Sequence, residues 1–337
     1  MITRKPHDMD DFDFIAIGDI TTDAFIQLRD ASVEDGIDGR KKLCVTFGDK
    51  IQYENVVVIP AVGNSANAAV AAARLGLKSG LVTNVGSDDH GKEDLESLKK
   101  NDVAINFVKI HEGKLSNYHY VLRFGAERTI LIKHEAYDYA IPDIGSPKWI
   151  YLSSLGENSL PFHHTLAKYL TERPEIKLAF QPGTFQIKLG YENIPDIYKL
   201  SELFFCNVQE AKRILKTKEN DIQKLLLGMR DLGPTIVVIT DGPAGAYTYD
   251  GKEMWHMPMY PDIAPPVDRT GAGDSFASTF TSALALGKSI PEALMWGPVN
   301  SMSVVQYIGA QEGLLSRSQL EKFLREAPDT YKPKQIK

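Results

Sequence analysis

Short runs of apolar, β-branched or aromatic residues alternate along the chain with longer segments in which apolar residues recur at helical spacing. The apolar runs predict buried strands at residues 14–17, 80–85, 149–152, 178–180, 203–206 and 236–240. The other segments predict helices at residues 65–75, 91–101, 162–172, 208–217, 221–231, 274–286 and 292–307. Nearly continuous apolar strands alternating with helices are typical of a parallel sheet covered on both faces. We therefore predict a doubly wound, mostly parallel α/β fold.

Two segments, residues 24–60 and 104–139, interrupt this alternation. Both carry strand-like runs, such as residues 42–47 and 117–123. We predict that they form a small β-sheet that is inserted in the α/β core and covers the active site as a lid, so that water is excluded during reaction. An edge extension of the main sheet with no lid role is the alternative.

Composition narrows the class of protein. The 337 residues are 43% hydrophobic and 24% charged, which is typical of a globular domain. The net charge of −6 and the lack of a basic block argue against a nucleic-acid surface. No apolar run approaches the length of a membrane span, and the N-terminus lacks the apolar core of a signal peptide, so we expect a cytoplasmic protein with small-molecule partners. Cys44 and Cys206 are not spaced as a zinc site or a disulfide framework.

The most informative segment for chemistry is residues 268–276, in which Gly271, Ala272 and Gly273 precede Asp274 and a predicted helix. The first N–H groups of a helix have no intrahelical acceptor, and small residues let an anion approach them closely. Asp274 follows at once and is placed to accept a proton from a hydroxyl group. Taken alone, the segment also fits a packed turn or the start of a dinucleotide fingerprint, although Phe276 replaces the third glycine of that fingerprint. The chain contains no G-x-x-x-x-G-K-[ST] phosphate loop.

Five further motifs accompany this segment in a fixed order. They are Gly18-Asp19-Ile20-Thr21-Thr22-Asp23, Gly63-Asn64-Ser65-Ala66-Asn67 and its continuation to Gly76, residues 84–91, Asn207-x-x-Glu210, and Thr240-x-Gly242-x-x-Gly245. Together with Asp268-x-x-Gly271-Ala272-Gly273-Asp274, this ordered set resembles the ribokinase-like, or PfkB, carbohydrate and nucleoside kinases. The resemblance covers residues 12–325, which we take as a single kinase domain with terminal tails at 1–11 and 326–337.

The resemblance implies a ribokinase-like fold and ATP-dependent phosphoryl transfer to a hydroxymethyl-type hydroxyl group. It implies that Asp274 is the general base and that the N–H groups of Gly271, Ala272 and Gly273 form the anion hole. Matched residue by residue, it gives the substrate pocket as Asp23, Gly63, Asn64 and Asn67, and the ATP site as Asn207, Thr240, Gly242, Gly245 and Asn300. It also implies Mg²⁺ near Glu210, held through water, and a monovalent cation such as K⁺ near Asp268.

The acceptor is less well defined because the chain departs from the family pattern. Val62 stands where the family often has a glycine, Gln181-Pro182-Gly183 replaces an Asp-Pro-Asn sequence, and the acidic position after the central strand of ribokinase falls at Leu155-Gly156. Arg269 replaces a small hydroxyl residue and has no assigned role. We expect a small sugar or sugar-like alcohol as the acceptor.

Two other functions remain open. A nucleoside kinase is the nearer alternative, because the lid segments contain aromatic residues that would stack on a nucleobase, namely Phe47, Tyr53, Tyr118, Tyr120 and Phe124. The same residues would suit a dimer interface, and we expect a homodimer formed through the lid sheet. A sugar- or nucleotide-binding protein without turnover is the more remote alternative.

Overall fold

A long, mostly parallel sheet forms the centre of the molecule in the computed structural model, which describes residues 12–37, 39–125 and 127–336. Its parallel strands are β1 (Phe14–Ile17), β6 (Ser79–Gly86), β7 (Val108–His111), β10 (Trp149–Leu152), β11 (Lys177–Phe180), β12 (Ser201–Asn207) and β13 (Ile236–Thr240). The antiparallel strands β14 (Ala246–Tyr249), β15 (Met254–Met257) and β16 (Lys334–Ile336) extend one edge. The strand order is β16-β15-β14-β13-β12-β11-β10-β1-β6-β7.

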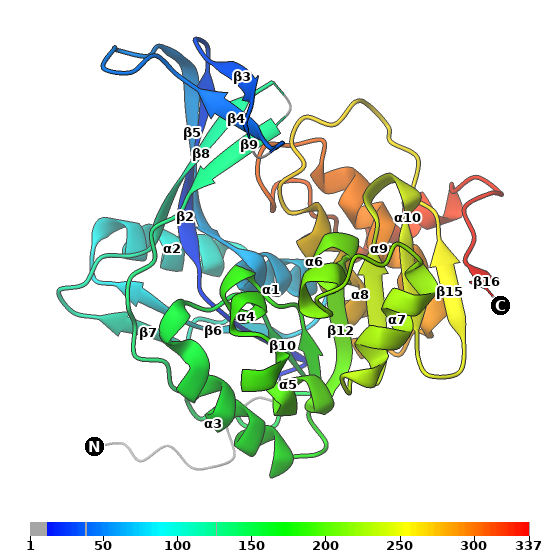
Figure 1. The fold of residues 1–337 in the computed structure, drawn as a ribbon. Coiled ribbons are helices and arrows are strands. Elements are labelled where there is room, and N and C mark those ends of the chain that lie inside the picture. Colours follow the sequence, from blue (N-terminus) through cyan, green and yellow to red (C-terminus); the bar gives the residue numbers. More distant parts are fainter. Residues whose placement is uncertain (1–11, 38, 126, 337) are drawn as a thin grey trace, which may run out of the picture.

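Helices cover both faces of this sheet (Figure 1). One layer contains α1 (Asn64–Arg74), α2 (Asp89–Lys100), α8 (Ala272–Ala285), α9 (Ile290–Val304) and α10 (Arg317–Arg325). The other contains α3 (Leu160–Thr171), α4 (Thr184–Leu189), α5 (Pro195–Leu200), α6 (Val208–Ile214) and α7 (Ile222–Asp231). Short 3-10 turns are η1 (Glu157–Ser159), η2 (Tyr191–Asn193) and η3 (Gly242–Ala244).

Alternate residues of the central strands supply two separate cores. In β1, Phe14 and Ala16 pack into the core beneath α1 and α8, whereas Ile15 and Ile17 pack into the core beneath α3. All four are fully or almost fully buried, because side chains alternate between the two covered faces of the sheet. This arrangement confirms the predicted doubly wound fold. No helix in the described part of the chain is both long and apolar enough to cross a membrane.

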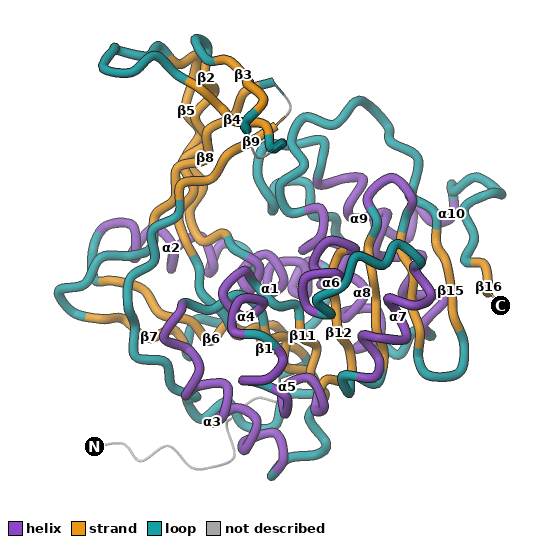
Figure 2. Tube along the Cα trace, in the orientation of Figure 1, coloured by secondary structure: helices purple, strands orange, loops and turns teal. Residues whose placement is uncertain are grey.

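A second sheet stands above the body and is referred to below as the lid (Figures 1 and 2). Its strands are β2 (Thr21–Leu28), β5 (Tyr53–Val62), β8 (Tyr118–Phe124) and β9 (Glu127–Leu131), in the order β5-β2-β8-β9. The pair β3 (Ser32–Asp35) and β4 (Lys41–Cys44) lies in the connection between β2 and β5. The boundaries differ from those expected in two places. Residues 108–111 belong to the main sheet as β7, and residues 334–336, expected in a tail, form β16.

The register of the lid strands separates two faces. Asp23 of β2 lies beside Ile59 of β5 and His119 of β8, and this face of the lid looks into the central cavity. Side chains of neighbouring residues in a strand point to opposite faces of the sheet. The set of paired residues that starts one position further along β2 therefore lies on the outer face of the lid. This outer row of cross-strand partners consists of Val58, Ala24, Tyr120 and Leu131.

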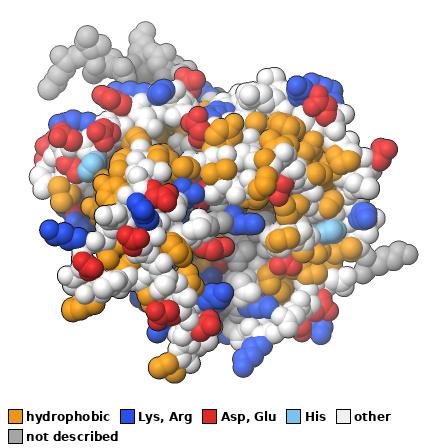
Figure 3. Space-filling view, turned by 90° about the horizontal axis from the view of Figure 1, so that it is seen from above, with side chains coloured by type: hydrophobic (Ala, Val, Ile, Leu, Met, Phe, Trp, Pro, Cys, Tyr) orange, Lys and Arg blue, Asp and Glu red, His pale blue; other side chains and the backbone are white. Residues whose placement is uncertain are grey.

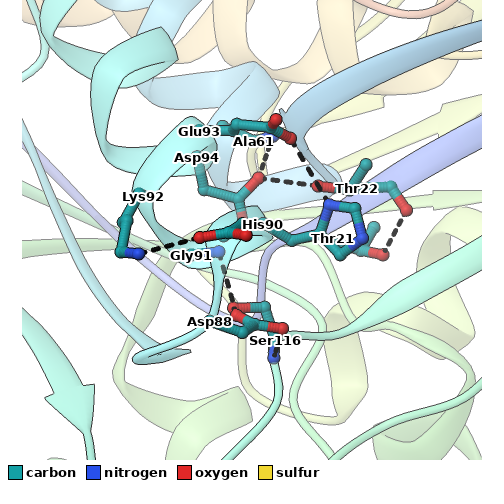
Figure 4. Close-up of polar contacts among 11 residues, drawn as sticks. Thr21, Thr22, Ala61, Asp88, His90, Gly91, Lys92, Glu93, Asp94 and Ser116 are labelled. Atoms are coloured by element: carbon teal, nitrogen blue, oxygen red, sulfur yellow. Dashed lines mark hydrogen bonds and ion pairs between the residues drawn. The ribbon is translucent and has the colours of Figure 1, made fainter.

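A buried carboxylate of the body holds the base of the lid (Figure 4). Oδ1 of Asp94, on α2, accepts a hydrogen bond of 3.0 Å from the Thr22 hydroxyl in β2 and one of 2.6 Å from the Ala61 N–H in β5. Ala61 has a positive φ of 54°, which is unusual for a residue with a Cβ atom. Asp94 therefore links α2 to both strands at the point where the lid leaves the body.

Candidate active site

A cavity of about 410 Å³ lies between the lid and the carboxyl ends of the central strands. Seen from above, the molecule is hollowed near its middle, and side chains of both charge signs border the hollow (Figure 3). Sequence motifs far apart in the chain meet there. Those lining this cavity are Asp23, Gly63, Asn64, Asn67, Asn207, Glu210, Thr240, Gly271, Ala272, Gly273 and Asp274.

Asp274 lies in the first turn of α8 and accepts hydrogen bonds from three side-chain amides. Asn64 and Asn67, from the first turn of α1, donate to Oδ1 and Oδ2 respectively, each over 2.9 Å. Gln181, directly after β11, donates to Oδ1 over 3.1 Å. The packing of α1 against α8 thus places two amides of one helix on a carboxylate of the other.

The surroundings of Asp274 set its proton affinity. Burial raises the pKa of the Asp274 carboxyl above its ordinary value, and the hydrogen bonds from Asn67, Gln181 and Asn64 counteract only part of that rise. A carboxyl whose pKa is raised is a stronger base than an exposed aspartate. The amides also fix its orientation.

The backbone before Asp274 is open to an anion. Gly271 is the N-cap of α8 with φ of 79°, and no side chain caps the first N–H groups of the helix. A Cβ on Gly271 would lie 2.3 Å from Cβ of Ala310, whereas a Cβ on Gly273 would meet no atom within 4 Å. Glycine at 271 is therefore required by conformation and packing, while glycine at 273 leaves free space beside uncapped N–H groups, which favours binding of a phosphate oxygen.

The lid end of the cavity contains buried polar atoms without a hydrogen-bond partner. They are Oδ1 of Asp19, Oδ1 of Asp23, Nε2 of His119, Nε of Arg128 and Nδ1 of His134, all from residues that line the cavity. Nδ1 of His119 is 3.4 Å from Oδ1 of Asp23, which is within ion-pair distance but without hydrogen-bond geometry. Buried polar groups are nearly always paired in native proteins, so this group of donors and acceptors indicates a polar ligand.

A second cavity of about 280 Å³ adjoins the first on the side of β13. Thr240, Gly242 and Gly245, which the motif analysis assigned to a nucleotide site, line this cavity. Its wall has much more apolar than polar surface, from residues that include Met259, Pro298 and Met302. An apolar cavity next to an anion-binding helix terminus suits a nucleotide, with its nucleobase in the cavity and its phosphates at the helix terminus. Arg269 lines both cavities and thus stands at their junction.

Glu210 and Asn207 form a reciprocal cap at the start of α6. The Asn207 N–H donates to Oε2 of Glu210 over 2.9 Å, and the Glu210 N–H donates to Oδ1 of Asn207 over 2.9 Å. Burial raises the pKa of the Glu210 carboxyl. No group of three or more His, Cys, Asp or Glu side chains in the described residues is arranged to hold a metal ion. A cavity-lining carboxylate such as Glu210 fits a hydrated Mg²⁺, which keeps most of its water ligands.

Two residues expected in the site lie outside both cavities. Asn300 is fully buried, donates to the Thr279 hydroxyl over 2.8 Å and accepts the Leu315 N–H over 2.9 Å. It therefore holds α9 against α8, while its neighbours Ser301 and Met302 line the second cavity. Asp268 is also buried, and its carboxylate accepts hydrogen bonds from Thr270 and from the Gly309 N–H.

Several cavity residues were not identified from the sequence, namely Asp19, His119, Arg128, His134 and Gln181. Asp19 belongs to a motif that was recognised, and its acidic side chain was the available indication of a role. The aromatic residues considered for nucleobase stacking are elsewhere. None of Phe47, Tyr53, Tyr118, Tyr120 and Phe124 lines either cavity.

Comparisons with known proteins show the family and the fold to which the chain is similar. The model of the pfkB family of carbohydrate kinases matches residues 38–317. A ribokinase of Bacillus subtilis (strain 168) is 30% identical over 270 residues, which are 78% of this chain and 87% of the relative. Arabidopsis thaliana ribokinase complexed with ribose and ATP has a similar fold, with a TM-score of 0.76 at 20% identity, covering 94% of this chain and 99% of that chain. A nucleoside kinase of Methanocaldococcus jannaschii has a TM-score of 0.74 at 19% identity, with the same coverage of both chains.

Proposed function

The chain belongs to the pfkB family of carbohydrate kinases, and on that premise we propose that it transfers the γ-phosphoryl group of ATP to a primary hydroxyl of a small sugar or sugar-like alcohol. The observation that carries the proposal is the position of Asp274. A half-buried carboxylate held by three amides lies one residue from uncapped N–H groups, in a cavity that joins a polar compartment to an apolar one.

In the proposed reaction, Asp274 accepts the proton of the acceptor hydroxyl as that oxygen attacks the γ-phosphorus. The N–H groups of Gly271, Ala272 and Gly273 stabilise the negative charge on the phosphoryl oxygens. Phosphoryl transfer depends mainly on positioning and charge stabilisation, and the first turn of α8 supplies both.

Asp23, Gly63, Asn64 and Asn67 border the acceptor in this proposal. The unpartnered atoms of Asp23 and its neighbours favour a polyol, because each hydroxyl group both donates and accepts a hydrogen bond. A nucleoside remains the alternative acceptor. The nucleoside alternative is less well supported, because the aromatic residues expected to stack on a nucleobase lie outside both cavities.

On the donor side, Asn207, Thr240, Gly242 and Gly245 border ATP. Glu210 would hold Mg²⁺ through water, and the ion would neutralise charge on the β- and γ-phosphates. We assign Asn300 a supporting role through its contacts between α8 and α9. Asp268 remains the candidate position for K⁺, and a cytoplasmic location remains a prediction.

We also propose a homodimer formed through the outer face of the lid. Val58, Tyr120 and Leu131 lie in one row of that face, and about half of each side chain is exposed (47%, 48% and 52%). Apolar side chains that are contiguous and exposed in this way mark an interaction surface. Light scattering at working concentration tests this, and a monomeric mass would contradict it.

The activity itself is tested by measuring ADP release with ATP, Mg²⁺ and a panel that contains ribose, fructose, other small polyols and adenosine. We expect turnover with a free sugar or polyol and loss of at least 100-fold in Asp274→Asn, with ATP binding retained. Turnover with adenosine alone would support the nucleoside alternative. Binding of ATP and a sugar without turnover would support the non-catalytic alternative.

A further inference from the structure

Gln181 connects the proposed base to a tyrosine of the sheet. Its Nε2 donates to Oδ1 of Asp274 over 3.1 Å, and its Oε1 accepts a hydrogen bond from the hydroxyl group of Tyr151. We propose that Tyr151 and Gln181 act as a positioning pair, in which the tyrosine fixes the orientation of the amide and the amide fixes Asp274 as the base. This inference rests on the proposed function, because it assigns a role in the reaction of that site.

The direction of these hydrogen bonds follows from the chemistry of the groups. Tyr151 is fully buried, and burial raises the pKa of its phenol well above the ordinary value, so the hydroxyl keeps its proton and is able to donate. If the Gln181 amide were turned over, Oε1 would face the carboxylate of Asp274, where neither oxygen carries a proton. Only one orientation therefore gives Asp274 a donor and Tyr151 an acceptor.

The surrounding chain makes this pair rigid. Tyr151 lies in β10, where its ring stacks on Phe14 of β1 with centroids 5.6 Å apart. The Gln181 N–H donates to the Leu152 carbonyl over 2.9 Å, which continues the β10–β11 pairing by one residue. Pro182 follows and restricts the backbone of Gln181. Tyr151 thus lies in a strand of the central sheet, and Gln181 directly follows one.

An amide at this position also avoids adding a like charge. Asp274 lies close enough to Glu210 to raise the pKa of the Glu210 carboxyl, and Arg128 of the lid lowers the pKa of Asp274. The buried phenol of Tyr151 also interacts with Asp274, whose charge raises the pKa of the phenol further. A carboxylate at 181 would add repulsion where Gln181 now adds a donor, so the neutral amide favours the ionised form of Asp274, which is the form that acts as a base.

Kinetics over a pH range test the proposal with the acceptor that turns over fastest in the panel. Gln181→Glu keeps the size of the side chain and the contact with Tyr151, but replaces the donor with a like charge. We expect it to move the acidic limb of kcat upward by about one pH unit, a tenfold change in proton affinity. Tyr151→Phe should lower kcat about tenfold with little change in KM for ATP.

Tyr198→Phe is the matched control. Tyr198 is also fully buried, but its hydroxyl has no hydrogen-bond partner in the structure, so the change should leave kcat and its pH profile as in the wild type. A kcat within twofold of wild type and an unmoved acidic limb in both Gln181→Glu and Tyr151→Phe would overturn the proposal.

A second measurement does not depend on activity. Gln181→Met should lower the Tm of the wild-type protein by roughly 2 °C, but should not lower the Tm of an Asp274→Ala protein, where the amide has already lost its acceptor. Gln186→Met is the control, because buried Gln186 bonds to the Ser153 carbonyl and not to Asp274, and its effect should be equal in both proteins. If Gln181→Met lowered the Tm of the wild-type and the Asp274→Ala proteins equally, the proposed contact between Gln181 and Asp274 would be overturned even if the protein is an active kinase. If the Tm effects depended on Asp274 but no acceptor were phosphorylated, only the kinase proposal would fail.

Discussion

Asn67 donates a hydrogen bond of 2.9 Å from its Nδ2 to Oδ2 of Asp274. The orientation of this amide is fixed in turn by Gln311, whose Nε2 donates to Oδ1 of Asn67 over 3.0 Å. The sequence placed Asn67 among residues that contact the substrate. In the structure its nitrogen bonds to the proposed base and its oxygen accepts from Gln311. We therefore propose that Asn67, besides bordering the acceptor, orients Asp274.

This relationship predicts which kinetic constant changes. Asn67→Leu removes one donor to a half-buried carboxylate and should lower kcat at least tenfold, because hydrogen bonds to charged groups contribute about 1.5–3 kcal/mol. KM for the acceptor should change much less. Asp23→Asn provides the contrast, since Asp23 faces the polar end of the cavity and its loss should act mainly on the acceptor KM. Steady-state kinetics of both variants decide, and the opposite pattern would return Asn67 to substrate binding.

Two glycines of one turn should respond differently to the same substitution. Gly271→Ala introduces a side chain at φ of 79° and 2.3 Å from Ala310, so the folded protein should lose stability. Gly273→Ala places its Cβ in open space and should leave Tm nearly unchanged, but should lower kcat/KM for ATP, because that space adjoins the N–H groups proposed to hold the phosphoryl oxygens. Thermal unfolding and ATP kinetics separate the two effects. Full activity of Gly273→Ala would argue against the anion hole.

Arg269 is expected to contact the phosphates of ATP, because it lines both cavities at their junction. Arg269→Thr, which restores the small hydroxyl residue common in the family, should lower kcat/KM for ATP at least tenfold, since charge-assisted hydrogen bonds to phosphate are strong. Arg317→Thr is a control on the surface of α10, where the guanidinium pairs with Glu321 instead. Equal kinetics of the two variants would leave Arg269 without a role in the site.

The sequence predicted the long elements well because each carries its own local pattern. The expected helix at 274–286 is α8 at 272–285, and the one at 65–75 is α1 at 64–74. It missed α4 and α5, whose six residues each are too few to show a helical period. It also missed β14, in which tyrosines alternate with smaller residues that are more deeply buried.

The site was predictable only where a motif surrounds the residue. His119 contacts Asp23 because β8 pairs in parallel with β2, and no local pattern sets that register across 96 residues of chain. In the sequence, Gln181 was noted only because it stands where the family pattern has an aspartate. Its function depends on Tyr151 of a neighbouring strand and on Asp274 of α8, which meet only after the sheet and its helix layers have assembled.

The buried carboxylate at the base of the lid predicts a pH dependence of stability. Burial raises the pKa of Asp94 from 3.8 to about 6, although hydrogen bonds from Ala61 and Thr22 oppose the rise. The folded protein therefore holds a proton between about pH 4 and 6 that the unfolded chain has released, so the free energy of unfolding falls as pH rises through this range. The full loss above pH 6 is about 3 kcal/mol, at 1.36 kcal/mol per pKa unit.

Asp94→Asn should remove this slope while Oδ1 continues to accept from Thr22 and Ala61. Relative to wild type, the variant should gain about 2 kcal/mol of unfolding free energy between pH 4.5 and pH 7.5, measured by urea denaturation at a series of pH values. Asp88→Asn is a control for which the pH dependence of stability should have the opposite sign. Burial raises the pKa of Asp88 but hydrogen bonds from Ser116 and Gly91 outweigh it and leave the pKa lowered, so this contact loses stability as pH falls. Parallel pH profiles of Asp94→Asn and wild type would show that Asp94 stays ionised in the folded protein and that its burial does not control the base of the lid.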